Sequence, residues 1–382
     1  MRVAMIGSRG VPAAAGGVEH VVAELARALA GRGHEVLVYA RPWYLRGGTG
    51  TAAAADMTGV RVITTPGLPG KHTDTITHTA TALWDVLRRD VDVVHVHSPG
   101  PALLSFVPAL AGRRVVLTVH APDWQRARWS FPARAALRAG LAVGMHAASA
   151  VTAVAPHLAD YLRRTFGRDV SYIPNGVGER PRRARGGFAL AEVGLTEGQY
   201  VLCVGRIVPE KRLDLLIDAW GTGRIPLPLA VVGEATGEAG YAAACRKQAP
   251  EQVRFLGPQF GEALEVLYDG AAVVAQPSEL EGMSLVLLEA ATHGCCIVAR
   301  DIPANREVLG EAMATFADDS PETLANTIIK CVRDVEWRSD LGRRARDRVR
   351  GRFCWPKIAA EYERVYCCPR HRRQPTGSPL RS

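Results

Sequence analysis

A chain of 382 residues is long for a single hydrophobic core and ordinary for two, so the sequence predicts two domains. Hydrophobic residues make up 47% of the chain and charged residues 22%, which is typical of a globular enzyme. The net charge is +9, but no aromatic-interleaved basic groove accompanies it, which argues against a nucleic-acid partner.

Short apolar runs alternate with helical patterns along the whole chain. The N-terminal run is too short and too soon interrupted for a signal peptide, and the longest apolar stretch, 135–155, contains Arg138 and His146, which argues against a membrane span. Near-continuous apolar runs between helices predict an α/β protein with buried parallel sheets. The predicted strands are 3–6, 35–39, 60–64, 93–97, 115–120, 150–154, 171–173, 200–204, 229–232, 253–256, 272–275, 296–299 and 313–316.

The first strand is followed by a glycine-rich loop, from Gly7 to Gly17, and then by a helix. Glycines there, among them Gly16 and Gly17, let the backbone approach a ligand closely and expose helix N–H groups. The loop does not match the G-x-G-x-x-G fingerprint and is longer than a dinucleotide-binding turn. An ordinary surface loop is the alternative interpretation.

Two patterns at the strand 93–97 invite a metal interpretation. Asp90 and Asp92 form an Asp-x-Asp pair, but they only introduce this buried strand, so we reject a metal site there. His95 and His97 share one strand face because side chains alternate with a period of two. Packing of that face under a helix is favoured over metal ligation.

His120 ends the strand 115–120 at the carboxyl edge of the first sheet. That edge is where α/β sheets place their ligands. A structural histidine is an equally good interpretation of the position taken alone.

The character of the chain changes near residue 174, where polar and turn residues replace the apolar runs. We interpret 175–187 as a linker between a first domain, 1–174, and a second domain, 188–350. Residues 353–368 form a last helix, and the basic tail 369–382 is expected to be disordered.

The strand 200–204 is followed by Gly205 and a highly charged turn. Arg206, Lys211 and Arg212 crowd the N-terminus of an amphipathic helix, where the helix dipole is positive. Each cation costs about 0.3–1 kcal/mol there, and Glu210 offsets only part of it. A bound anion would make the cluster of cations favourable. The alternative interpretation is an exposed charged turn without a ligand.

The segment 277–294 is the most informative in the chain. Glu281 and Gly282 lead into a helix that carries Glu289 on its second turn. Eight residues of helix span about 12 Å, which is too far for the two carboxylates to share a proton. It also exceeds the separation of roughly 5–9.5 Å in hydrolase acid pairs. The spacing suits two contacts on one long ligand, with an anion at the helix N-terminus between them.

Much of the excess positive charge lies late in the chain. A solvated helix face and a basic tail are favoured over attraction to anionic lipid or to a phosphate-bearing acceptor. The arginines that carry this charge are Arg343, Arg344, Arg346, Arg348, Arg350, Arg352, Arg370, Arg372 and Arg373.

The eight cysteines show no C-x2-C spacing, so we expect reduced thiols in the cytoplasm and no zinc site.

These motifs resemble those of a known enzyme family. The segment 277–294 resembles the E-x7-E signature of retaining glycosyltransferases of family 4, and Gly205 to Lys211 matches their Gly-Arg-x(4)-Lys motif. Residues 7–12 and 118–129 are similar to a bacterial rhamnosyltransferase-like subgroup, although Ala121 stands where that subgroup usually has glycine. The resemblance implies the GT-B fold, in which two Rossmann-like, doubly wound parallel-sheet domains face a cleft and the last helix crosses back onto domain one.

The resemblance also implies roles for the residues of these motifs. Glu289 would bind the ribose hydroxyls of a nucleotide sugar, and Glu281 a hydroxyl of its sugar. Cations and helix N–H groups would stabilise charge on the leaving diphosphate. The diphosphate-binding residues would be Arg206, Lys211, Gly282, Met283 and Ser284, and the rest of the donor site Gly16, Gly17, Gly205 and Leu285.

In domain one, the resemblance implies that His120 contacts the donor sugar near the reacting carbon. With Glu281, Arg206 and Lys211 it would form the catalytic group. Arg9, Asp123, Trp124 and Arg128 would border the acceptor. No metal and no other cofactor is implied, because GT-B enzymes need none.

The sequence thus predicts a cytoplasmic retaining glycosyltransferase. Its donor would be a UDP, dTDP or GDP sugar, and its acceptor a cell-surface glycan, a glycolipid or a specialised metabolite. Peripheral contact with the inner face of an anionic membrane stays open. A GT-B-fold sugar-nucleotide epimerase and a non-catalytic nucleotide-sugar-binding subunit remain alternatives. No pyridoxal-lysine motif supports a glycogen-type phosphorylase, and no glycine fingerprint supports a dehydrogenase.

Overall fold

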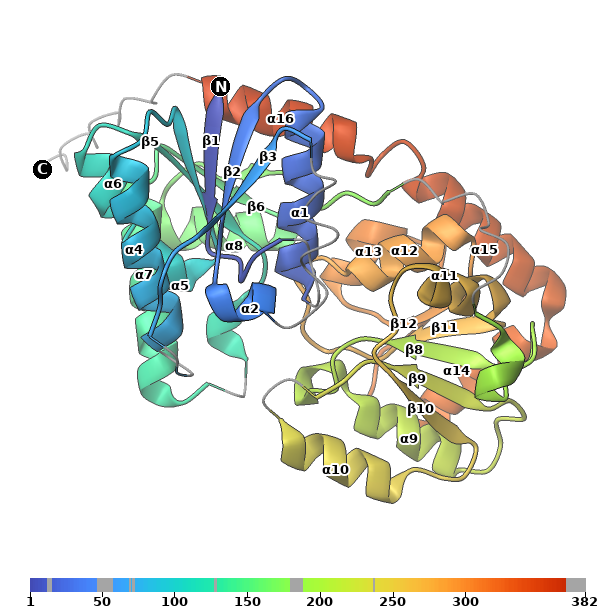
Figure 1. The fold of residues 1–382 in the computed structure, drawn as a ribbon. Coiled ribbons are helices and arrows are strands. Elements are labelled where there is room, and N and C mark those ends of the chain that lie inside the picture. Colours follow the sequence, from blue (N-terminus) through green and yellow to red (C-terminus); the bar gives the residue numbers. More distant parts are fainter. Residues whose placement is uncertain are drawn as a thin grey trace, which may run out of the picture.

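The computed structural model describes residues 1–11, 16–46, 58–68, 70, 73–126, 129–178, 188–235 and 238–368. It contains two parallel sheets, each with helices packed against it (Figure 1). The first sheet has the strand order β3-β2-β1-β4-β5-β6-β7 and the second β10-β9-β8-β11-β12-β13. Each order reverses direction beside its first strand, which is the doubly wound arrangement that the sequence predicted.

The first sheet and its helices occupy the N-terminal part of the chain. The elements are β1 (Arg2–Ile6), α1 (Gly17–Ala30), β2 (Glu35–Ala40), α2 (Pro42–Arg46), β3 (Val60–Thr64), α4 (Thr73–Leu87), β4 (Val93–His97), α5 (Pro99–Ala102), α6 (Phe106–Leu110), β5 (Arg114–Val119), the 3₁₀ turn η2 (Asp123–Gln125), α7 (Phe131–Ala147), β6 (Ala150–Ala153), α8 (Pro156–Phe166) and β7 (Ser171–Tyr172).

The second sheet follows in the C-terminal part. Its elements are η3 (Leu190–Val193), β8 (Val201–Val204), η4 (Pro209–Lys211), α9 (Leu213–Gly221), β9 (Leu229–Val232), α10 (Ala239–Gln248), β10 (Val253–Gly257), α11 (Gly261–Gly270), β11 (Val273–Gln276), α12 (Leu285–His293), β12 (Ile297–Arg300), α13 (Pro303–Leu309), β13 (Ala314–Phe316), α14 (Pro321–Arg333), α15 (Val335–Val349) and the final α16 (Trp355–Cys367).

All the predicted strands are confirmed, to within one residue at either end. Their success has a simple cause: β1, β4, β8, β9, β11 and β12 are buried or nearly so along their whole length. A strand covered on both faces must be apolar at consecutive positions, which is the pattern that the sequence displays.

The last helix, α16, lies against domain one, beside α1 (Figure 1). Tyr362 and Tyr366 are buried in the same apolar cluster as Val3 of β1. At the surface, Glu363 accepts hydrogen bonds from Arg32 at 2.6 Å and pairs with a ring nitrogen of His34 at 2.7 Å. The chain that ends domain two therefore returns to complete domain one. The predicted linker lies outside the described residues from 179 onward, and so does the tail from 369.

Arg343, Arg344 and Arg346 of α15 are exposed, as predicted for a solvated helix face, and several arginines of this helix also donate hydrogen bonds to carbonyls of other segments. Arg346 donates to the carbonyl of His293 at 2.7 Å, where α12 ends, and Arg348 to that of Val308 at 2.9 Å, near the end of α13. Arg344 donates to the carbonyl of Glu311 at 3.0 Å. The last carbonyls of a helix have no partner inside the helix, so these guanidinium groups cap two helix C-termini.

Asp90 and Asp92 both bind Arg2. The Asp92 carboxylate accepts from the Arg2 backbone N–H at 2.7 Å, and the Asp90 carbonyl accepts from the Arg2 guanidinium at 2.9 Å. The pair thus fastens the start of β1 to the start of β4, at the edge opposite to the carboxyl ends. No helix in the described part of the chain combines the length and the apolar character needed to cross a bilayer.

Candidate active site

A positive and a negative side chain meet beyond the carboxyl ends of β8 and β11. Lys211, at the end of η4, donates to Oε1 of Glu281, which lies in the loop before α12. Gln276, the last residue of β11, donates to the same oxygen at 2.8 Å. Burial alone would raise the pKa of Glu281, but the charge and hydrogen bond of Lys211 bring it below its usual value. Glu281 is therefore ionised at neutral pH and held in one position.

A small pocket lies beside this pair. It is lined by the β8 end and the η4 turn on one side and by the residues after β11 on the other. Because the two strands are neighbours, their carboxyl-end loops face each other across the pocket. The lining residues include Gly205, Arg206, Lys211, Gln276 and Ser278.

The N-terminus of α12 opens towards the same place. The Ser284 side chain caps the helix by accepting from the Leu287 N–H at 3.3 Å, and it donates to Gln276 at 2.8 Å. The backbone N–H groups of Gly282, Met283 and Ser284 donate no hydrogen bond to any residue that the structure describes. Such N–H groups and the positive end of the helix dipole favour an anion. The Met283 side chain itself is buried and accepts from the Asn175 N–H at 3.1 Å.

Glu289 lies one turn further along α12. Its Oε2 accepts a hydrogen bond from the Tyr268 hydroxyl at 3.0 Å. Burial raises the pKa of Glu289, and the nearby His20, Tyr268 and His293 offset this only in part. Glu289 is partly exposed, and a carboxylate with one neutral partner has spare acceptor capacity, which suits it to hydroxyl donors.

A third acidic residue, Glu210, is enclosed between two arginines. Its side chain is only 5% exposed, and neither carboxylate oxygen accepts a hydrogen bond within the described residues. Arg126 of domain one lies 3.6 Å from Oε1, and Arg206 lies 3.9 Å from it. This contact joins the two domains next to the pocket.

His120 follows β5 at the carboxyl edge of the first sheet. It is buried, and its Nε2 lies 3.0 Å from Nδ1 of His97. Burial lowers the pKa of His120 to about 4, with Glu19 opposing the shift. The imidazole is therefore neutral at physiological pH and can accept or donate one hydrogen bond to a ligand.

The end of the glycine-rich loop that the structure describes, Gly16 and Gly17, lies close to α12 of domain two. Gly16 has a φ of 103°, which disfavours any other residue, and a Cβ on Gly17 would lie 3.6 Å from Leu285 of α12. Arg9 pairs with the buried Glu19 at 2.9 Å. Burial would raise the pKa of Glu19, but the bonds from Arg9 bring it below normal. Arg9 therefore fastens the loop to the start of α1.

Gly205 has a backbone conformation that favours glycine, and its backbone lies close to that of Gly233. Its φ is 149°, and a Cβ on Gly233, at the end of β9, would lie 1.9 Å from the Gly205 carbonyl oxygen. The loops after β8 and β9 therefore pack backbone against backbone at the pocket wall.

The residues predicted for the acceptor side are placed differently from one another. Asp123 pairs with Arg126 at 3.1 Å. We had expected Trp124 to border the acceptor. Its side chain is instead only 2% exposed, lies in the core cluster of domain one and stacks on Tyr161, so the ring supports the loop. Arg128 lies outside the described residues.

Several residues of the site were not singled out by sequence reasoning. Gln276 is the last residue of β11 and Ser278 lies two residues beyond it, and the carboxyl edge of a predicted strand was the available signal for both. His97 was assigned to packing under a helix, yet it contacts His120. Glu210 was seen only as a partial counter-charge.

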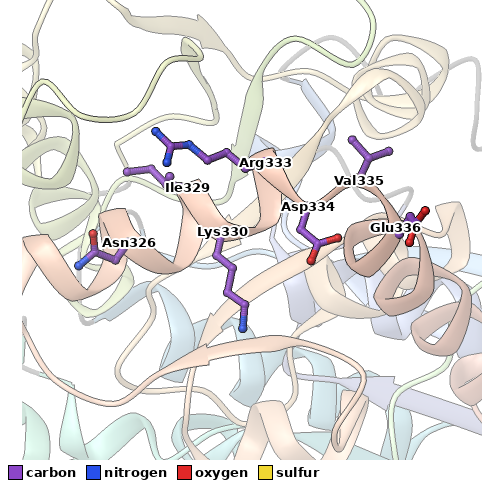
Figure 2. A pocket seen from close by; sticks show the side chains of 7 residues that line it. All are labelled: Asn326, Ile329, Lys330, Arg333, Asp334, Val335 and Glu336. Atoms are coloured by element: carbon purple, nitrogen blue, oxygen red, sulfur yellow. The ribbon is translucent and has the colours of Figure 1, made fainter.

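A larger hollow lies elsewhere on the described surface. It has a volume of about 660 Å³ and is formed where α14 meets α15 (Figure 2). The residues that line it, Asn326 to Glu336, include long charged side chains that point in different directions. None of the predicted site residues lines this hollow, so it does not change the assignment of the candidate site.

Two family models match the chain in succession. Residues 15–179 match the model described as "Glycosyltransferase Family 4", and residues 191–348 match "Glycosyl transferases group 1". Together these matches span both domains.

Curated relatives match over nearly the full length. A "Phosphatidyl-myo-inositol mannosyltransferase" of Mycolicibacterium smegmatis is 29% identical over 92% of this chain and 90% of its own. A "GDP-mannose-dependent alpha-(1-6)-phosphatidylinositol monomannoside mannosyltransferase" of Mycobacterium tuberculosis is 27% identical over 92% of this chain and 94% of its own.

Solved structures share the fold. A sucrose-phosphate synthase from Thermosynechococcus elongatus superposes with a TM-score of 0.78 at 23% identity, covering 96% of this chain and 98% of that one. Anabaena Alr3699/HepE in complex with UDP-glucose gives a TM-score of 0.77 at 19% identity, covering 96% and 99%.

Proposed function

We propose that this chain, which belongs to glycosyltransferase family 4, transfers a hexose or deoxyhexose from a nucleotide-diphosphate sugar to an acceptor, with retention of anomeric configuration. The observation that supports this most is that Lys211 and Arg206 line one pocket, while the open N-terminus of α12 is tied to the pocket wall by the hydrogen bond from Ser284 to Gln276. The charges of Arg206 and Lys211, together with three backbone N–H groups that donate to no described residue, match a diphosphate.

The chemistry that we propose is electrostatic. When the bond from the sugar to the diphosphate breaks, negative charge grows on the leaving phosphate. Arg206, Lys211 and the α12 N-terminus stabilise that charge, and because they are already positioned, they need little reorganisation. No acid or metal ion is required to protonate or bind the leaving group.

The two carboxylates of the E-x7-E segment fix the ends of the donor. Glu289 accepts from the ribose hydroxyls, and Glu281 from a hydroxyl of the sugar. The rigid bonds of Glu281 to Lys211 and Gln276 support this assignment, since an oriented acceptor positions the sugar for reaction. His120 contacts the same sugar from domain one.

The comparisons bear on the donor and acceptor only through relatives. The two full-length relatives are named as mannosyltransferases that act on phosphatidylinositol compounds, and one of them as GDP-mannose-dependent. GDP-mannose and a glycolipid acceptor are therefore the first substrates to test. The rhamnosyltransferase-like motifs of domain one make dTDP-rhamnose the second donor to test.

The test is a panel of nucleotide sugars measured by thermal shift and by product analysis. A donor stabilises the folded state by mass action, and transfer then releases the nucleoside diphosphate when an acceptor is present. Isomerised free donor would indicate an epimerase, and a bound donor that stays intact with every acceptor would indicate a binding subunit. Absence of binding by all UDP, GDP and dTDP compounds would overturn the assignment.

A further inference from the structure

A buried row of three histidines extends inward from the site in domain one. His120 contacts His97 of β4, and the rings of His97 and His95 are 4.0 Å apart. Both His95 and His97 are fully buried. A plain packing role explains their burial but does not explain why polar rings should fill an apolar core, where each needs a hydrogen-bond partner.

His95 is held on both sides. Its Nδ1 lies 2.8 Å from the hydroxyl of Tyr366 on α16, and its Nε2 lies 2.6 Å from the hydroxyl of Thr118 on β5. Burial lowers the pKa of His95 to about 3, so the ring stays neutral. A neutral imidazole with two hydroxyl partners has both nitrogens satisfied. The His95 ring is therefore held in one orientation, and it packs against the His97 ring.

His97 has only one partner. Its Nδ1 contacts Nε2 of His120 at 3.0 Å, and its Nε2 is buried with no hydrogen-bond partner in the described part of the chain. A hydrogen bond between these two nitrogens needs a proton on one of them and a lone pair on the other. Each ring is neutral and therefore carries a single N–H proton. If His120 donated, the proton of His97 would lie on its Nε2 as a buried N–H without an acceptor. Buried N–H groups without acceptors are rare, because the lost hydrogen bond to water is not replaced.

The other arrangement avoids that cost. With the proton on Nδ1, His97 donates to Nε2 of His120 and keeps only an unused lone pair in the core. His120 must then carry its own proton on Nδ1. That nitrogen makes no hydrogen bond with any described residue, so it is the one left for a ligand.

We propose that His97 is a positioning residue that fixes His120 in the Nδ1–H tautomer, so that His120 offers the donor sugar a hydrogen-bond donor and cannot act as a base. The role of His120 towards the sugar rests on the proposed function, whereas its tautomer rests on the contact with His97 alone. The acceptor atom on the ligand is an oxygen of the sugar or of the leaving phosphate.

The direct experiment is NMR of ring nitrogens in protein labelled with ¹⁵N-histidine, recorded without ligand at mildly alkaline pH. His146 is an internal reference, because its Nδ1 bonds the carbonyl of Ala142 at 2.7 Å and must therefore be protonated. We expect His120 to show the same pattern as His146. A His120 signal with the proton on Nε2 overturns the proposal, whether or not the protein binds a nucleotide sugar.

Two variants test the consequence for activity. His97→Asn keeps an amide group near the Nδ1 position that can donate, and His97→Leu removes the donor at similar volume. For His97→Leu we expect kcat to fall about 10–100-fold, as for outer-shell partners of other functional histidines, with His120 shifting to a mixture of tautomers.

His97→Asn should recover most of the activity and the Nδ1–H pattern. Equal loss in both variants with an unchanged His120 tautomer shows a purely structural role and overturns the proposal. If the tautomer is as expected but no nucleotide sugar binds, the failure lies in the proposed function.

Discussion

Gly282 of domain two approaches the backbone carbonyl of His120 in domain one so closely that a Cβ at position 282 would lie 1.8 Å from that oxygen. Backbone atoms cannot move aside as the end of a long side chain can. This contact therefore makes glycine necessary for the observed approach of the two domains, and it does so at the residue between Glu281 and the N-terminus of α12.

Gly282→Ala should disrupt catalysis while leaving each domain folded. The added methyl group must push His120 and α12 apart, and misplacement of about 1 Å can cost roughly 100-fold in rate. We expect a loss of that order in kcat/KM with a small change in melting temperature. Gly240→Ala is the matched control, because a Cβ there meets nothing within 4 Å. Wild-type activity in Gly282→Ala would show that the working enzyme does not use this approach.

Lys211→Met should cost both stability and activity, because it leaves Glu281 ionised and partly buried without its cation. Breaking such a pair costs roughly 3 kcal/mol. The double variant Lys211→Met, Glu281→Gln should recover much of the melting temperature and none of the activity. Thermal unfolding and turnover measured on the same samples separate the two effects. Recovered turnover in the double variant would remove both residues from the proposed chemistry.

The Lys211–Glu281 pair also predicts a pH dependence of stability. The pKa of Glu281 is lower in the folded protein than in the unfolded chain, so folding favours the ionised form. Its contribution is present above the ordinary carboxyl pKa and is lost as the pH falls through the lowered value. In acid denaturation, Glu281→Gln should therefore lose less stability between neutral and acidic pH than the wild type.

As the pH is lowered, donor affinity should begin to weaken at a higher pH than it would if Glu289 had the pKa of an ordinary glutamate. The pKa of Glu289 is raised, so this side chain becomes protonated early as the pH falls and loses acceptor capacity for ribose hydroxyls. Calorimetric titration with the nucleoside diphosphate across the acidic range measures the effect. Glu289→Gln should bind weakly at all pH values and lack this acidic limb. The same acidic limb in the variant would assign it to another group.

Arg346→Ala should lower the melting temperature, since it uncaps the carbonyl of His293 at the end of α12. A hydrogen bond of this kind contributes about 1 kcal/mol. Arg343→Ala is the control, because Arg343 is exposed and pairs only with Asp340 on its own helix among the described residues. Both variants remove one positive charge. Equal loss of binding to anionic vesicles with equal stability would favour a membrane role for this helix.

The sequence was sufficient where a single physical requirement determined the residue type. Strands buried on both faces need unbroken apolar runs, so the strands were recognised. The anion site around Lys211 stays a prediction, and the structure adds to it that Lys211 lies against Glu281. The sequence was insufficient where a side chain had two equally good surroundings. Trp124 could border a ligand or fill the core, and only the three-dimensional packing against Tyr161 decides between them.

The same limit applies to charge. An arginine on a helix surface has the same sequence pattern whether it faces water or reaches a carbonyl of another helix. Arg346 and His293 are far apart in sequence, so their hydrogen bond depends on how α15 lies against α12. The pairing of His97 with His120 depends likewise on the register between β4 and β5, in which His97 lies beside Thr118.

The return of α16 to the first sheet has a consequence for biosynthesis. Trp355, Ile358, Tyr362 and Tyr366 complete the apolar cluster around β1, yet they are translated only after the strands of domain two. While domain two is translated, the part of this sheet face that α16 covers in the folded protein therefore stays exposed beside α1, although N-terminal domains usually fold first. A chaperone, or a transient partner, would be most useful to this protein during that interval.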